Sequence, residues 1–433
     1  MLRVLTVLPA FLLAVVAEDV VVTTTLGQLR GSRVSTGPST YLDTFFGVPY
    51  AKPPVGALRL MPTQPAEPWQ GVLDATRYGP ECPQLPLPFD PNPSPTPTSE
   101  DCLTLNIFTP GHQADPPRLL PVMMFVHGGA FKGGSGSRFN GTELAKRGVV
   151  VVTINYRLDI LGLFNKVIME SGFATCQWAR KLPTDTPSPL TFAKLVAAKV
   201  GCPVDSGTAA LVACIKSKPV DVLLPASAAF LDGSPAIFIP VVETGFGVIP
   251  KNPEELIREG AGSDILSIRG SNKDEDTIEA LNEDRPPLQL SEAERVSGDR
   301  QQKGVRTPVR LPVHLPVTQL RFSFLDRMPT RLRFCAGVPH TAELPFVFGD
   351  PFNGRKNWTD ADKRVAANVM DLWTNFAKFG DPTPPGYSGV RWSPYNSQTQ
   401  VYLTIDDRPS LNSHLFQKRM DLIKSLYDQF GHY

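Results

Sequence analysis

The sequence lacks an excess of charge of either sign, a long hydrophobic run and any internal repeat. Its 433 residues include 43 Lys and Arg against 42 Asp and Glu, which gives a net charge of +1. A chain this close to neutrality produces no field that would attract nucleic acid or an anionic membrane. No apolar segment reaches the roughly 20 residues of a transmembrane helix, and no His, Cys, Asp or Glu cluster has metal-ligand spacing. We therefore expect no membrane span, no nucleic-acid partner, no metal and no cofactor.

Proline is abundant, with 44 residues, about twice the usual share of roughly 5%. This predicts many ordered loops, or stretches without regular structure. Apolar residues at 42% and charged residues at 20% are typical of a soluble globular protein.

Residues 1–17 have the pattern of a signal peptide. Arg3 is followed by an almost wholly apolar stretch from Val4 to Val16, and the small residue Ala17 precedes Glu18. The C-terminal residues DQFGHY show neither a hydrophobic tail nor a retention signal. We therefore expect a secreted chain, or one in the secretory-pathway lumen, with a single domain over residues 18–433.

Six cysteines fit an oxidising compartment. Six cysteines allow 15 pairings, so the spacing only suggests two local pairs, each closing a loop worth about 3 kcal/mol in the chain-entropy model. These pairs are Cys82 with Cys102 and Cys202 with Cys214, which leave Cys176 and Cys335 without obvious mates. The triplets at Asn140 and Asn357 are N-glycosylation sequons.

The order of elements predicts an α/β fold. Residues 120–129 and 148–157 are near-continuous apolar runs, as in strands buried on both faces, and 141–148 between them reads as a short helix. This strand–helix–strand pattern favours a mostly parallel central sheet flanked by helices. Further strands are expected at 20–25, 27–34, 105–110, 265–272, 320–326 and 400–405, and helices at 187–217, 253–260, 359–380 and 413–430. The Arg- and Pro-rich stretch 282–318 is expected to be a solvated loop.

The segment FVHGGAFKGG at 125–134 runs from a buried strand directly into a glycine turn. Glycines let the backbone approach a ligand and expose consecutive N–H groups, as in the oxyanion hole of an esterase. A plain turn at the end of a strand is the other interpretation, and the glycines alone favour that one.

Several motifs occur in the order of one known family. They are FFGVPYAKPPVGALRL (45–60), SEDCLTLNIFTP (99–110), VHGGAF, GVVVVTINYRLDILG (148–162), KVIMESG (166–172), GSNKDE (270–275), AGVPHTAELPFVFG (336–349) and LWTNFAKFGDP (372–382). With these motifs the chain resembles the type-B carboxylesterase/cholinesterase family of α/β-hydrolases. The resemblance covers most of the chain outside 283–318.

The resemblance implies a catalytic serine, histidine and glutamate. The serine attacks the ester carbonyl, the histidine moves its proton, and the acid orients the imidazole. By motif, Glu275 matches the acid, His340 the base, and Gly129 and Ala130 two oxyanion-hole donors, with Gly128 just before them.

The nucleophile of that family is absent. No serine has Gly at both −2 and +2, as the G-x-S-x-G elbow requires. RLDILGLF ends at Phe164 and NKVIMESG begins at Asn165, although in the family a helix, the central strand and the elbow separate these stretches. Ser171 matches the stretch after the elbow and is no substitute. The pattern predicts an internal deletion at 164/165.

Loss of the serine predicts a chain that is not a competent esterase. In a known template this loss costs about 10⁶-fold in turnover, or roughly 8 kcal/mol. A shortened splice product or an incomplete gene model explains the gap better than an evolved non-enzyme. The alternative is a non-catalytic extracellular binding or adhesion module, a role that some non-catalytic members of the family have.

Two further expectations follow from the gap and from one loop. Loss of a central strand leaves two unpaired strand edges and exposed apolar faces, so the flanking strands either pair again or the product misfolds.

Residues 83–101 contain no tryptophan, and cholinesterases place a cation-binding tryptophan there. Small carboxylic esters, rather than choline esters, are therefore the expected substrates of an active parent form; the protein partner is unknown.

Overall fold

The computed structural model describes most of the chain in separate stretches. These are residues 18–37, 40–85, 96–111, 119–161, 181–183, 187–229, 238–242, 249–260, 267–272, 317–322, 341–354, 357–415, 417, 421 and 425. Within these residues no helix is long and apolar enough to cross a membrane. The predicted signal peptide and the predicted helix at 413–430, apart from a few residues, lie outside the described residues.

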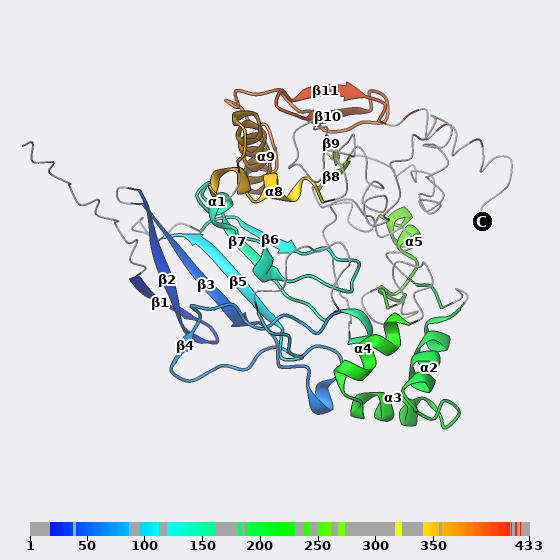
Figure 1. The fold of residues 1–433 in the computed structure, drawn as a ribbon. Helices are drawn as coiled ribbons and strands as arrows, with labels where there is room; N and C mark the ends of the chain where they lie inside the picture. The colour runs from blue at the N-terminus through cyan, green and yellow to red at the C-terminus, as the bar shows by residue number, and fades with distance from the viewer. Residues whose placement is uncertain are drawn as a thin grey trace, which may run out of the picture.

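A seven-stranded mixed sheet forms the N-terminal half (Figure 1). Its strand order is β1-β2-β3-β5-β7-β6, with β4 pairing beside β2. The strands are β1 (Glu18–Thr24), β2 (Gly27–Gly37), β3 (Thr40–Pro49), β4 (Val72–Asp74), β5 (Thr104–Pro110), β6 (Val122–Val126) and β7 (Val150–Ile154).

The predicted strand–helix–strand unit is present. Strand β6 pairs in parallel with β7, and α1 (Thr142–Ala145) lies between them in the chain. From β1 through β2, β3 and β5 to β7, by contrast, all neighbours are antiparallel. The α/β class is therefore confirmed, while the parallel pairs of this sheet are β6 with β7 and the short β4 with β2.

A second, four-stranded sheet has the order β11-β10-β9-β8. Strands β8, β9 and β10 are mutually parallel, and β11 adds antiparallel to β10. The strands are β8 (Ser267–Asn272), β9 (Val317–Phe322), β10 (Val401–Ile405) and β11 (Ser410–Ser413). Among the described strands, β6 and β8 are therefore each the outermost strand of a sheet.

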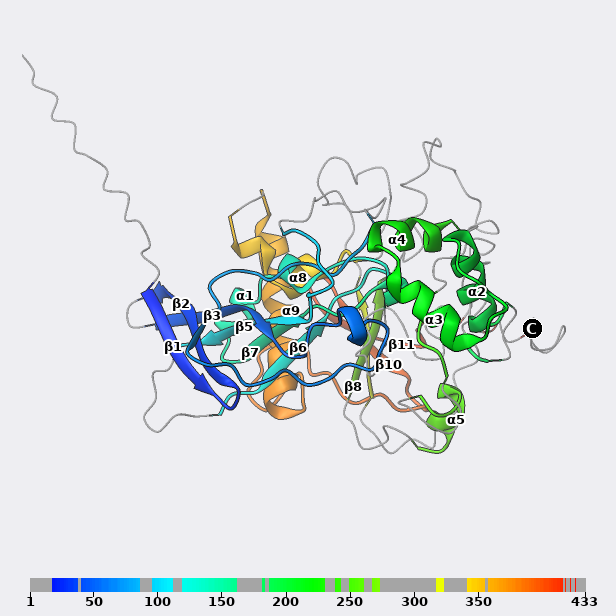
Figure 2. The ribbon, with the colours of Figure 1, turned by 90° about the horizontal axis from the view of Figure 1, so that it is seen from below.

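Short helices complete the fold. Below the large sheet in Figure 1, α2, α3 and α4 gather beside one another, and Figure 2 places them at the opposite end of the molecule from β1. The helices are α2 (Pro189–Lys199), α3 (Thr208–Ser217), α4 (Val220–Ala228), α5 (Pro253–Arg258), α8 (Leu344–Val347) and α9 (Asp360–Phe379), with 3₁₀ turns η1 (Gly56–Leu58), η2 (Gly136–Arg138), η3 (Asp159–Leu161) and η6 (Asp350–Phe352).

The region predicted to be helical, residues 187–217, contains two helices, α2 and α3. Gly201 and Gly207 adopt left-handed backbone at φ 72° and 86°, which ends one helix and precedes the next. A disulfide between Cys202 and Cys214 joins the break to α3. The helices therefore fold back on one another rather than continuing.

Helix α9 matches its prediction closely. The Thr359 hydroxyl accepts from the Asp362 N–H, and the Asp362 carboxylate accepts from the Thr359 N–H at 2.8 Å, which makes a capping box. Gly380 ends the helix at φ 69°. Val365, Val369 and other buried residues form its apolar face.

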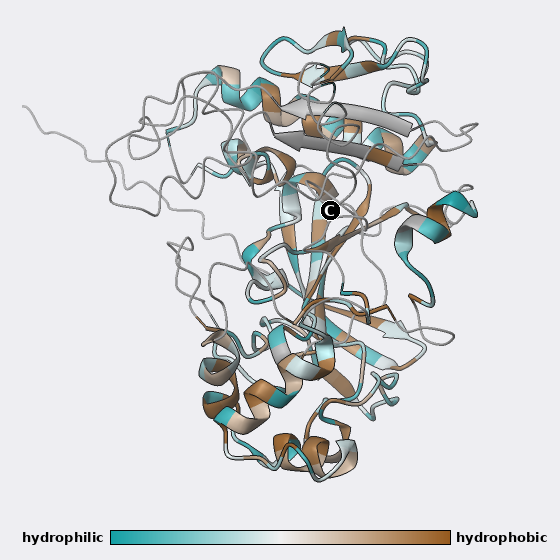
Figure 3. Cartoon of the chain, turned by 90° about the vertical axis from the view of Figure 1, so that its right-hand side faces the viewer, coloured by the Kyte–Doolittle hydropathy of each residue, from teal (hydrophilic) through white to brown (hydrophobic). Residues whose placement is uncertain are grey.

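One hydrophobic core connects the two sheets through α9. Buried side chains of the large sheet, such as Phe108 and Val151, belong to the same cluster as Leu403 and Ile405 of β10 and the inner face of α9. Figure 3 shows hydrophobic strands running through the middle of the molecule. The second sheet is thus held to the rest of the fold by side-chain packing, because no hydrogen-bonded ladder joins the two sheets within the described residues.

Candidate functional site

The candidate site is the loop from His127 to Gly134, which follows strand β6. The backbone turns sharply there, with φ of 125° at Gly129, 52° at Ala130 and 61° at Phe131. Non-glycine residues rarely adopt positive φ, and such strain persists only where the surroundings hold it. The N–H groups of Lys132 and Gly133 donate to the Gly129 carbonyl at 2.9 and 3.2 Å, which closes the turn.

Two glycines allow this turn to pack. A Cβ at Gly129 would lie 2.0 Å from the Gly133 carbonyl oxygen, and one at Gly134 would lie 2.3 Å from His127 Nδ1. Gly134 also has a φ of 110°. Both positions therefore require glycine.

The N–H groups of Gly129 and Ala130 donate no hydrogen bond to another described residue. Gly129 is partly buried and Ala130 is exposed. Two consecutive N–H groups at a strained turn, without a partner among the described residues, are able to bind an oxygen that carries negative charge. The predicted role of Gly129 and Ala130 as oxyanion-hole donors stays a prediction.

The buried side chain of His127 packs against the turn. Its ring is 3% exposed and stacks on Tyr156 with ring centroids 4.4 Å apart. Nδ1 donates to the Gly128 carbonyl at 2.8 Å in the tautomer that this contact requires, and the Tyr156 hydroxyl donates to the His127 carbonyl at 2.6 Å. Nε2 is buried without a hydrogen-bond partner. Burial lowers the pKa of His127 to about 4, so the ring is neutral at pH 7 and serves as packing and as a donor.

A buried carboxylate anchors the far end of the loop. Glu81 is fully buried and pairs with Arg138, whose Nη2 lies 3.1 Å from Oε2. The hydroxyl groups of Ser135 and Ser137 donate to Glu81 Oε1 at 2.5 and 3.3 Å. Buried charges persist when they are paired and hydrogen-bonded in this way.

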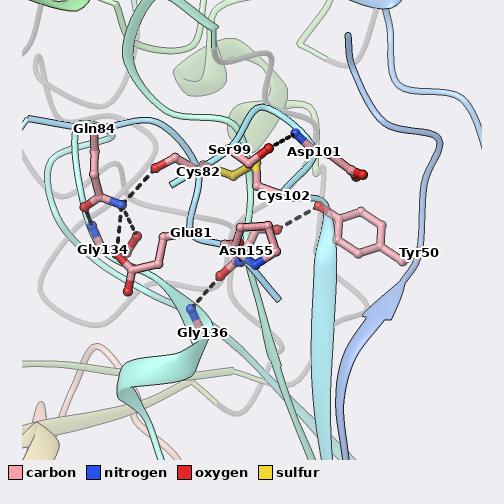
Figure 4. Close-up of a disulfide and its surroundings, with 11 residues drawn as sticks. Tyr50, Glu81, Cys82, Gln84, Ser99, Asp101, Cys102, Gly134, Gly136 and Asn155 are labelled. Atoms are coloured by element: carbon pink, nitrogen blue, oxygen red, sulfur yellow. Dashed lines mark hydrogen bonds between the residues drawn. A yellow bond between two sulfur atoms is a disulfide. The ribbon is translucent and has the colours of Figure 1, made fainter. Parts of the chain in front are cut away.

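Two amide side chains connect this anchor to the first disulfide (Figure 4). The Gln84 amide donates to the Gly134 carbonyl at 3.0 Å and accepts from the Gly134 N–H at 2.8 Å. The Asn155 amide, at the end of β7, accepts from the Gly136 N–H at 2.8 Å. The disulfide between Cys82 and Cys102 lies beside them, with Cα atoms 5.0 Å apart. These hydrogen bonds hold the loop at Gly134, and the chain just after it at Gly136, against the disulfide region and the end of β7.

The predicted site residues fall into two groups. The described residues include Gly129 and Ala130, both predicted disulfides, and the sequons at Asn140 and Asn357, whose side chains are exposed. The predicted acid and base, Glu275 and His340, lie outside the described residues, as do Cys176, Cys335, Ser171 and the 164/165 junction. Their arrangement stays a prediction.

Sequence reasoning missed the residues that hold the loop in place. Glu81, Gln84 and Arg138 have no motif of their own, and a glutamate next to a cysteine is normally a surface residue. No local signal distinguishes them, because Gln84 and Gly134 are 50 residues apart in the chain, and Glu81 and Arg138 are 57 residues apart. Among the described residues, no group of three or more His, Cys, Asp and Glu is arranged to hold a metal.

The carboxylesterase family model matches three stretches, residues 18–164, 161–307 and 312–423. The second stretch ends at residue 307, so it includes part of the segment 283–318 that the motifs left outside the resemblance. Two of the stretches meet at 161–164, next to the predicted junction.

Several curated proteins are similar to the chain. Neuroligin-2 of Mus musculus is 27% identical over 567 residues, which covers 91% of this chain and 66% of the relative. Neuroligin-3 of Mus musculus is 26% identical, covering 91% and 67%. Acetylcholinesterase of Bungarus fasciatus is 24% identical over 521 residues, covering 91% and 84%. The chain thus spans about two thirds of the neuroligins' length, and each alignment is longer than the 433 residues of the chain, so the relatives contain stretches that have no counterpart here.

Proposed function

Because this chain belongs to the carboxylesterase family, we propose that it is a secreted member that does not hydrolyse esters. The fold and the loop that would supply the oxyanion hole are in place, but the serine that would start acyl transfer is missing from the sequence. The chain is, on this proposal, a shortened form of a Ser-His-Glu esterase.

The observation that supports the proposal is the absence of the serine elbow from a chain whose described sheets end at β6 and at β8. The sequence has no G-x-S-x-G, and among the described strands β6 and β8 are both outermost. In an α/β-hydrolase the elbow stands between a central strand and the helix that follows it. Outer strands at the end of one sheet and the start of another are what deletion of that central strand would leave.

The chemistry left to the chain is limited. Two oxyanion donors and a base without a nucleophile retain only the residual catalysis of about 10³ to 10⁴ over water seen in a template without its triad. Gly129 and Ala130 would still polarise a bound carbonyl, but no acyl-enzyme would form.

The test is hydrolysis of a nitrophenyl ester by the purified, folded chain, with and without a serine-directed organophosphate. We expect no burst and no turnover that the organophosphate removes. The matched control is a chain in which the family's missing segment is inserted between Phe164 and Asn165, which we expect to gain organophosphate-sensitive turnover. Organophosphate-sensitive turnover by the unmodified chain, at the speed of ordinary esterases, would contradict the proposal.

The origin of the gap has its own test. Sequencing transcripts across codons 164 and 165 should reveal longer transcripts that carry a G-x-S-x-G codon run. If codons 164 and 165 are adjacent in every transcript and the genome contains no skipped exon, no longer esterase form exists. The chain would then be an evolved non-enzyme.

A second candidate function is an extracellular protein-binding module. It is favoured by the described part of the fold, which keeps its core and two disulfides without the serine, and by the resemblance, which includes non-catalytic binding members. Of the three relatives reported above, acetylcholinesterase is named for an ester-hydrolysing activity and the two neuroligins are not. Saturable binding of the purified chain to a cell-surface protein supports this candidate, and loss of that binding in an Asn140→Gln or Asn357→Gln variant would place the interface near a sequon.

A further inference from the structure

Strand β6 is an outer strand with the composition of an inner one. Its sequence is VMMFV, without a charge, a proline or a glycine. Natural edge strands are protected by charges, prolines, bulges or great shortness, since an unprotected edge pairs with other chains. Because β6 pairs with β7 on one side only, the backbone groups on its other side have no strand partner among the described residues.

One face of β6 is also exposed. Val122 is 61% and Met124 is 53% exposed, while Met123 and Phe125 on the opposite face pack against the main core. In the cross-strand row from Ile107 through Val152 to Met124, Val152 is 8% exposed and Met124, at the edge, is 53% exposed. An apolar row that ends in open solvent marks an interaction surface.

The side chains on this face of β6, of which Val122 and Met124 are exposed and Val126 is half-buried, read the same in both directions. Along this face β6 presents Val122, Met124 and Val126, so a second β6 running antiparallel places valine opposite valine and methionine opposite methionine. Cross-strand apolar pairs of this kind stabilise a sheet. The chain's net charge of +1 adds little repulsion between two copies.

We propose that β6 is a self-association site, where two copies of this chain pair their β6 strands antiparallel about a two-fold axis through Met124. The two large sheets become one continuous sheet, and each copy covers the exposed valine and methionine of the other. The interface is isologous, so it closes at a dimer. The proposal is independent of ester hydrolysis and goes beyond the proposed function.

The geometry gives a direct test. Residues directly opposite in an antiparallel pair have Cα atoms about 4.5–5.5 Å apart, within the roughly 4.4–6.8 Å that a disulfide spans. In the full chain, Met124→Cys should form a disulfide between the two copies at position 124 under mild oxidation, located by mass spectrometry. Val21→Cys, at a comparably exposed position (52%) on the other outer strand β1, is the matched control and should form none above the native chain.

A charge at the same place should separate the copies. Met124→Lys puts two like charges opposite one another, so the dimer dissociation constant from analytical ultracentrifugation should rise about tenfold or more, while Val21→Lys should leave it within about twofold. The folded near-ultraviolet spectrum of both variants serves as the check on structure. A native chain that is monomeric at every concentration, particles larger than a dimer, or a disulfide that joins position 124 to any other position overturns the proposal.

Discussion

The two ends of the large sheet differ in how each outer strand meets solvent. At the β1 end, Asp19 and Asp74 pair with Arg30 at 3.2 and 2.9 Å on the surface, and Val21 is a single exposed apolar residue. At the β6 end the strand has no charge, and two of its five residues are exposed and apolar. The β1 edge has the protection expected of an edge. The β6 edge lacks this protection.

The ion pairs at the two ends of the sheet also differ in burial. The ion pairs near β1 are in solvent, where such pairs contribute little. Beyond β6 the ion pair of Glu81 with Arg138 is buried under the loop and carries a network of hydroxyl donors. The β6 end therefore has the more buried polar network, and substitutions there should lower the free energy of unfolding far more than substitutions at the β1 end.

The largest expected contrast comes from removing a carboxylate at each end. Glu81→Ala leaves Arg138 and the hydroxyls of Ser135 and Ser137 without their acceptor, and should lower the free energy of unfolding by about 3–5 kcal/mol. Asp19→Asn removes one exposed partner of Arg30 and should leave the urea midpoint unchanged. Urea unfolding followed by tryptophan fluorescence measures both. Equal effects at the two ends would show that the loop is not held by Glu81.

The next contrast depends on pH. The folded pKa of His127 is about 4 because of burial, against about 6.5 in the unfolded chain. The unfolded chain therefore binds a proton first as pH falls, so this contribution to stability is complete above about pH 6.5 and is lost by about pH 4. The loss is about 3 kcal/mol, from 1.36 kcal/mol per pKa unit.

His127→Asn provides the control for this pH effect. The asparagine amide keeps a donor near the Nδ1 position and has no proton to gain. Urea unfolding at pH 7 and pH 5 should show a smaller decrease for the variant than for the native chain. The same decrease in both would mean that other groups account for the acid sensitivity.

The smallest contrast is between two glycines with positive φ. Gly134→Ala places a Cβ 2.3 Å from His127 Nδ1 at a φ of 110°, and should cost about 2–3 kcal/mol through strain and overlap. Gly71→Ala, next to β4 at the other end, has a φ of 72° and open space, and should cost about 1 kcal/mol from the backbone alone. Thermal unfolding of both variants tests the difference. If Gly71→Ala destabilises the protein more than Gly134→Ala does, the expectation of greater strain at Gly134 is wrong.

Much of the fold was predictable because its signals are local. Helix α9 has a capping residue, an apolar stripe and a terminal glycine within one segment, and the strands β6 and β7 are short apolar runs on either side of a helical one. The glycines of 128–134 predicted a turn at the end of a strand, and the family resemblance matched that turn to an oxyanion loop. Residues 187–217 were predicted to be helical and contain the helices α2 and α3. The break between these helices, with its two positive-φ glycines and its disulfide, was not predicted.

The candidate site was predictable only in part. Gly129 and Ala130 followed from the motif, and the family assignment is confirmed by the match over most of the chain. Glu81 and Gln84 were not predictable, because a carboxylate becomes an anchor through partners that reach it from distant segments. The roles of Glu275 and His340 stay predictions.

From the amino-acid order alone came the family, the absence of the serine elbow and the two cysteine pairs suggested by spacing, because each depends on residues close together in the chain. The sequence led us to expect unpaired strand edges with apolar faces, but only the tertiary structure identified β6 as an outermost strand among those described and showed that a fully buried glutamate holds the loop after it. Burial and pairing are properties of the assembled core, where neighbours come from every part of the chain.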